Sequence, residues 1–259
     1  MVVAACPLSK NRWMRVSVFK KTHLLLSIAL SVLGLFVSGL AQAGTFSVTP
    51  VRIFLQLRDR ATAITFTNDG ATEIVLQADL YEWLQKPNGE DDLKLAEDVI
   101  ISPPIIKLAP GAKQVVRLAR LSMAPSESQQ TYRLIAREIP EIAAAKQGIS
   151  VQIALALSMP VFITPRDAKP KVSCTTAKAN VDSVVFSCKN TGNAHAQVRY
   201  ARVMRDGNEL TQLNNGGYYL AGIQRNLTLP LGKVTAGALT LELALDDGST
   251  PSYSLQLAP

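Results

Sequence analysis

The chain has 259 residues and a formal net charge of +7 at pH 7, from 27 Lys and Arg against 20 Asp and Glu. Five of the basic residues and none of the acidic ones lie in residues 1–43, so the remaining 216 residues hold 22 basic and 20 acidic side chains. A net charge of +2 provides no sustained cationic surface, which removes the main support for nucleic-acid binding.

The N-terminal segment has the pattern of a secretory signal peptide. Lys20-Lys21 precedes the apolar stretch Leu24–Val37, and the small-residue sequence Ala41-Gln-Ala43 follows it. A basic start, an apolar centre and a small-x-small end predict a signal peptide over residues 1–43, cleaved after Ala43. A retained membrane anchor is the alternative, but the cleavage sequence favours removal, so we expect no stable membrane insertion.

Beyond this segment, nearly every interpretable stretch has the character of a β-strand. Turn sequences such as Asn68-Asp-Gly70 and Asp206-Gly207 separate the stretches, and many short strands with regular turns favour an all-β sandwich architecture. The Pro- and charge-containing segment Thr164–Pro170 predicts a linker, and hence domains at residues 44–164 and 168–259. The predicted strands are Thr45–Leu57, Ala63–Asn68, Ile74–Trp83, Gln114–Leu121, Thr131–Glu138, Ser150–Ile163, Val184–Cys188, Ala196–Met204, Leu227–Leu231 and Leu239–Leu245.

The predicted strand that begins at Ser150 has an unusual composition. Alternate side chains on one face are large and apolar, whereas those on the other face are small or weakly polar. Pro160 cannot donate to a ladder and is tolerated mainly at sheet edges. Such a strand either fills its own core or is offered to a partner. The apolar row is Val151, Ile153, Leu155, Leu157 and Met159.

Two cysteines remain after residue 43, Cys174 and Cys188, and each lies in a strand-like run. A hairpin would place them opposite each other, so we predict a disulfide, as expected for an exported protein. In the chain-entropy model it contributes about 3 kcal/mol. The alternative, a metal or catalytic thiol, lacks a nearby Cys/His cluster.

The residues needed for catalysis are sparse. His195 is the single histidine of residues 44–259, and no Gly-x-Ser-x-Gly elbow accompanies it. The acidic pairs Asp91-Asp92 and Asp246-Asp247 lie in turn sequences, which favours solvated loops over a metal site or a glycosidase pair. We therefore expect no enzymatic activity, cofactor or metal.

Several segments resemble the PapD-like periplasmic chaperones of chaperone–usher pilus assembly. The resemblance extends over roughly Gly44 to Ala258 and rests on motifs that occur in the family's order. They are Phe46-Ser-Val-Thr-Pro-Val-Arg52-Ile-Phe54, the run from Ser102-Pro-Pro through Leu108-Ala-Pro-Gly111 to Val116-Arg117-Leu118, Arg137-Glu-Ile-Pro140 with the apolar row after it, and Gly217-Tyr-Tyr-Leu-Ala-Gly222.

The resemblance implies two immunoglobulin-like sandwiches joined at an angle, in a periplasmic protein. It implies a chaperone that binds pilus or coat subunits by donating the apolar row, prevents their premature polymerisation and delivers them to an outer-membrane usher. A secreted two-domain adhesin or structural subunit is the alternative, and a secreted enzyme is the third interpretation. An uncapped edge also leaves open a self-capping dimer.

The resemblance also assigns roles to charged residues. Arg52 matches the family's cleft arginine, which together with a lysine holds the subunit's C-terminal carboxylate. Pro160 occupies the lysine position, so Lys113, Arg117 and Arg137 become candidate substitutes. For the family's interdomain charge network, Glu138 matches the glutamate, Asp246 or Asp247 the aspartate, and Thr164 stands at the arginine position with Arg166 close by. These departures resemble a divergent branch that serves spore-coat-U-like subunits.

Overall fold

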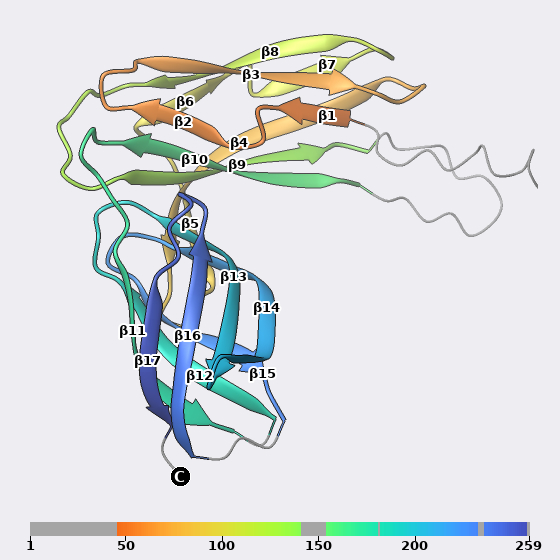
Figure 1. Cartoon of the computed structure of the whole chain (residues 1–259). Helices are drawn as coiled ribbons and strands as arrows, with labels where there is room; N and C mark the ends of the chain where they lie inside the picture. Colours follow the sequence, from red (N-terminus) through yellow and green to blue (C-terminus); the bar gives the residue numbers. More distant parts are fainter. Residues whose placement is uncertain (1–45, 141–153, 181, 233–235, 258–259) are drawn as a thin grey trace, which may run out of the picture. The chain divides into compact units, whose positions relative to one another are not determined.

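The computed structural model describes residues 46–140, 154–180, 182–232 and 236–257. These residues belong to one compact unit and form strands joined by turns, without a helix among them (Figure 1). Across the same ranges, the chain accordingly contains no apolar helix of membrane-spanning length. The predicted signal peptide lies outside the described residues.

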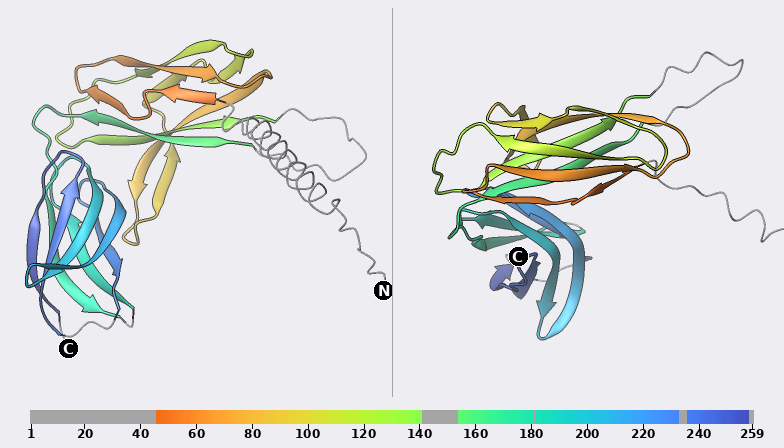
Figure 2. Two further views of the ribbon diagram at one scale, coloured as in Figure 1. Left: turned by 45° about the vertical axis from the view of Figure 1, so that its right-hand side comes forward. Right: turned by 90° about the horizontal axis from the view of Figure 1, so that it is seen from above.

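The first sandwich, residues 46–164, consists of two facing sheets (Figure 2). Its core lies between them and includes Ile64, Phe66, Leu76, Leu118 and Leu134, each fully buried. One sheet has the order β1-β3-β8-β6: β1 (Phe46–Thr49), β3 (Ala61–Asn68), β8 (Lys113–Arg120) and β6 (Val99–Ser102). The other has the order β2-β10-β9-β4-β5, with β7 also paired to β4: β2 (Ile53–Gln56), β10 (Ala156–Thr164), β9 (Gln130–Glu138), β4 (Ile74–Gln85), β5 (Asp91–Leu95) and β7 (Ile105–Leu108).

The predicted first strand, Thr45–Leu57, is divided in the structure. β1 pairs with β3 in one sheet, whereas β2 pairs in parallel with β10 in the other. Pro50 lies between them and has no N–H to continue a ladder, which accounts for the break. The chain therefore crosses from one sheet to the other at this point.

The second sandwich, residues 172–257, is formed by one seven-stranded sheet in the order β14-β13-β16-β17-β11-β12-β15. The two end strands of this sheet lie close together: the Thr211 Oγ1 on β14 donates to the Pro230 carbonyl on β15 at 2.6 Å. Phe186, Tyr219 and Leu241 fill the interior. The strands are β11 (Val172–Ala179), β12 (Ser183–Asn190), β13 (Ala196–Arg205), β14 (Asn208–Tyr219), β15 (Gln224–Pro230), β16 (Gly237–Leu245) and β17 (Ser252–Leu257).

The β13–β14 hairpin shows how local sequence sets the fold. Asp206 and Gly207 have φ angles of 50° and 80°, the left-handed values that a two-residue turn of this kind requires. Asp tolerates this region better than most residues and Gly adopts it freely, so Asp206-Gly207 forms the turn that its sequence predicts.

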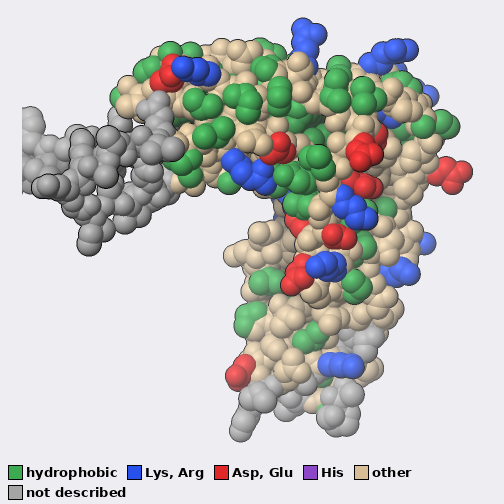
Figure 3. Space-filling model, turned by 180° about the vertical axis from the view of Figure 1, so that it is seen from behind, with side chains coloured by type: hydrophobic (Ala, Val, Ile, Leu, Met, Phe, Trp, Pro, Cys, Tyr) green, Lys and Arg blue, Asp and Glu red, His purple; other side chains and the backbone are tan. Residues whose placement is uncertain are grey.

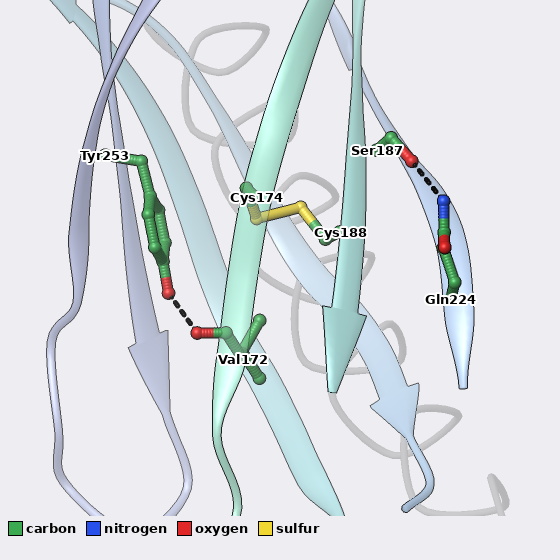
Figure 4. Close-up of a disulfide and its surroundings, with 6 residues drawn as sticks. All are labelled: Val172, Cys174, Ser187, Cys188, Gln224 and Tyr253. Carbon is green, nitrogen blue, oxygen red and sulfur yellow. Dashed lines mark hydrogen bonds between the residues drawn. A yellow bond between two sulfur atoms is a disulfide. The ribbon is translucent and has the colours of Figure 1, made fainter. Parts of the chain in front are cut away.

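The predicted disulfide between Cys174 and Cys188 is present (Figure 4). The two residues are directly opposite in the β11–β12 ladder, with Cα atoms 4.1 Å apart. Both cysteines are buried, which fits a structural role. The all-β fold class with two immunoglobulin-like sandwiches is likewise confirmed.

Candidate functional site

β10 has one edge that is only partly paired. Along its other edge, residues 156–163 pair with β9, from Ala156 opposite Arg137 to Ile163 opposite Gln130. β2 pairs with β10 only from Val161 to Thr164. Within the described residues, the peptide groups of residues 156–160 therefore have a strand on one side only. An exposed row of backbone donors and acceptors can accept a further strand.

The apolar row emerges from the core along this edge. Met159 is 2% exposed and belongs to the first sandwich's own core, Leu157 packs partly against that core, and Leu155 is 39% exposed. Met159 is thus part of the chain's own packing rather than an exposed side chain. Val151 and Ile153 lie outside the described residues. The exposed part of the row begins at Leu155 and Leu157, where the edge is open.

The outer face of the same sheet carries aromatic side chains that contact the second sandwich. Phe162 on β10 stacks on His195, with ring centroids 3.7 Å apart and planes 6° from parallel. Trp83 on β4 meets the edge of Tyr218 at 5.1 Å between centroids. Together with Leu220, Trp83 and Phe162 form a buried cluster separate from the two main cores.

Arg52, immediately before β2, lies beside this cluster. Its Nη1 is 3.8 Å from Asp246 Oδ2, and its side chain is 36% exposed. Partial burial raises the pKa of Asp246, but the interaction with the His195 ring and the hydrogen bond from the Gln197 N–H outweigh that effect and hold the pKa below its ordinary value. Asp246 is therefore an ionised partner for a guanidinium that still faces solvent.

The residues predicted as substitutes for the second cation do not all lie in the sheet that contains β10. Lys113 and Arg117 lie on β8, in the opposite sheet. Arg137 lies on β9 opposite Ala156 and pairs with Asp79, with 2.9 Å between Nη1 and Oδ2. Only Arg137 of the three therefore shares a sheet with the open edge.

A different arginine, Arg133, lies directly opposite Pro160 in the β9–β10 ladder, and so on the same face. Its guanidinium packs 3.7 Å above the Trp83 ring and its Nη2 is 3.3 Å from Asp91 Oδ2. Burial lowers its pKa, although an arginine stays charged. No sequence motif pointed to Arg133. Pairing the predicted strands Thr131–Glu138 and Ser150–Ile163 as neighbours could have found it.

The predicted interdomain residues are only partly brought together. Asp246 contacts the first sandwich through Arg52. Glu138 lies at the other end of β9 from Gln130, about 26 Å along a strand of this length, and its Oε2 accepts the Leu155 N–H at 3.4 Å. Asp247 accepts hydrogen bonds from Ser249 within its own turn, and Arg166 is exposed.

Gln129, also missed, makes the interdomain contact that Glu138 does not. Its Nε2 donates to Thr164 Oγ1 at 2.7 Å, and its Oε1 accepts the His195 backbone N–H at 2.9 Å. The position predicted for a charged network is thus linked by a neutral amide. Gln129 is a buried polar residue just before β9, and no pattern in the neighbouring sequence indicated that it would be buried.

Comparison with known proteins bears on this arrangement. A family model for the pili and flagellar-assembly chaperone, PapD N-terminal domain, matches residues 45–169. The chain carries a PapD-type chaperone domain. The matched family is described as an assembly chaperone, which agrees with the expectation that the chain is not an enzyme. A search of curated proteins found no match.

Solved structures share the fold of this chain over most of its length. A chain of the CsuC–CsuE chaperone–tip adhesion subunit pre-assembly complex, from the archaic chaperone–usher Csu pili of Acinetobacter baumannii, is 20% identical, with TM-score 0.60, covering 83% of this chain and 100% of that one. The E. coli chaperone DraB is 15% identical, with TM-score 0.54 over 82% and 96%. A chain of the Salmonella enterica SafA pilin–SafB chaperone complex is 12% identical, with TM-score 0.56 over 83% and 97%. At these identities the likeness shows the fold.

Proposed function

We propose that this chain is a periplasmic chaperone that captures pilus or coat subunits by strand addition and delivers them to an outer-membrane usher. The observation that carries the proposal is the half-open edge of β10, from which Leu155 and Leu157 emerge. A PapD-type domain and structural neighbours that are chaperones, two of them in complexes with a pilin or a tip subunit, support the same conclusion.

The energetics suit capture followed by release. Main-chain hydrogen bonds along an open edge give affinity with little sequence demand, and alternate apolar side chains fix the register. Burying Val151, Ile153 and Leu155 in a subunit groove gives about 1.5–3 kcal/mol each before ordering and association costs. No cofactor or nucleotide is required, because another strand can replace the donated one.

The position of β2 connects the open edge with Arg52. A strand added beside residues 156–160 must end where β2 begins to pair at Val161, and Arg52 directly precedes β2. A chain terminus there lies near a partly exposed guanidinium, which can bind a carboxylate through two parallel hydrogen bonds. We assign Arg52 as the anchor of that terminus.

Co-expression with a candidate pilus or coat subunit tests the proposal. Leu155→Asp places a charge in the donated row and is expected to abolish co-purification of the subunit, while the far-UV circular dichroism and melting temperature stay unchanged. Ala156→Asp, on the other face of the same strand, is the matched control and is expected to retain capture. Undiminished capture by Leu155→Asp contradicts the donor assignment.

A further inference from the structure

The His195 ring lies between the two sandwiches with both nitrogens close to acceptors. Its side chain is 9% exposed and stacks on Phe162. Nδ1 is 2.8 Å from Gln129 Oε1, and Nε2 is 3.5 Å from Asp246 Oδ2. A buried imidazole in such a position changes its hydrogen bonding when it changes its protonation.

The orientation of Gln129 is determined by its other partners. The same Oε1 accepts the His195 backbone N–H, and Nε2 donates to Thr164 Oγ1. A flipped amide would place two donors against each other, so Oε1 faces the ring and Nδ1 must donate. A neutral ring then turns the Nε2 lone pair towards the Asp246 carboxylate. Only the ring protonated on both nitrogens donates to Gln129 and Asp246 together.

Asp246 Oδ2 also faces Arg52, whose Nη1 is 3.8 Å away. Among the described residues, Tyr218 is the other titratable group near the ring, with ring centroids 5.8 Å apart; its pKa is raised by burial, so it is neutral at ordinary pH. Arg133 lies beyond Tyr218, 5.6 Å from the centroid of that ring. One carboxylate oxygen is thus shared by a permanent cation and a titratable one.

We propose that protonation of His195 releases Arg52 from Asp246, so that Arg52 binds an external carboxylate more tightly as the pH falls. When the ring is neutral, Arg52 is the counter-ion of Asp246 and is less available. When the ring is charged, His195 takes over that role. This coupling rests on the proposed function of Arg52 as an anchor. By linkage, a carboxylate bound at Arg52 favours proton uptake at His195 to the same extent.

Nuclear magnetic resonance of the full chain tests the coupling with acetate as probe and acetamide as the neutral control. Arg52 is followed through its Nε–H, and His195 through its ring protons, assigned with His195→Gln. Acetate is expected to bind about threefold more tightly near pH 5.5 than near pH 8, and to move the His195 titration to higher pH. Acetamide is expected to do neither.

Variants separate the coupling from the anchor function. Arg52→Gln removes the competitor for Asp246 and is expected to shift the His195 titration to higher pH, whereas Arg202→Gln, whose arginine pairs with Glu242, leaves it unchanged. In His195→Gln, acetate binding becomes independent of pH. Equal acetate affinity at both pH values, or a His195 titration unmoved by Arg52→Gln, overturns the coupling. Subunit capture insensitive to Leu155→Asp is a separate result, which refutes the proposed function instead.

Discussion

The two sandwiches differ in how completely the edges of their sheets are paired. The second brings the two ends of its sheet together and is cross-linked by the Cys174–Cys188 disulfide. The first leaves part of β10 unpaired and, in the described ranges, carries every large exposed hydrophobic side chain except Tyr200 and Leu210. Figure 3 shows such side chains spread over the first sandwich among charged ones. The second sandwich is therefore closed, whereas the first has a strand edge that can still pair with another strand.

Removing the disulfide is expected to give the largest effect, and only on the second sandwich. Replacing both cysteines with alanine should lower the free energy of unfolding by about 3 kcal/mol, because the closed loop no longer restricts the unfolded chain. Urea denaturation measures the loss. Subunit capture by the folded variant should persist at 25 °C, and its disappearance would show that the two sandwiches do not act separately.

Arg52→Ala is expected to weaken subunit binding at the first sandwich. Losing a charge-assisted contact to a carboxylate costs about 1.5–3 kcal/mol, a roughly tenfold or greater loss of subunit affinity. Surface plasmon resonance with immobilised subunit measures it. Arg202→Ala, on the second sandwich, is the control, and an Arg52→Ala affinity equal to that of the wild type would remove Arg52 as the anchor.

Asp246 makes the contact between the sandwiches sensitive to acid. Because its pKa in the folded chain lies below the ordinary value of 3.8, its ionised form stabilises the fold above that value, and this contribution is lost as the pH falls through 3.8 towards the folded pKa. Asp246→Asn lacks this loss. Its melting temperature should therefore fall less than that of the wild type between about pH 6 and about pH 3. Parallel curves would contradict the assignment.

Leu210→Asp, on the second sandwich, is expected to change neither subunit capture nor stability, in contrast to Leu155→Asp at the open edge. Leu210 is 39% exposed, the same fraction as Leu155, but lies on β14 of the closed sandwich. Capture and stability should stay within about 0.5 kcal/mol of the wild type. Reduced capture would show that exposed apolar area, rather than the open edge, determines binding.

The sequence predicted the strand-rich fold and the disulfide because these depend on local alternation and turn residues. It joined β1 and β2, because alternation alone does not reveal that a proline moves the chain to another sheet. It missed Arg133 and Gln129, because their roles arise from cross-strand register and from contacts with residues that are distant in the chain, such as His195. The alternation of apolar residues identifies which face of a strand is buried, but only the strand pairing identifies which residues lie next to each other.

The short strand β2 also has a consequence for selectivity. Because it pairs with the last four residues of β10, no further strand can pair with that part of the edge. In the proposed capture of subunits, a segment added to this edge would end against β2, so all subunits would be aligned from the same end whatever their sequence. Longer segments would then extend away from β2, towards residue 154.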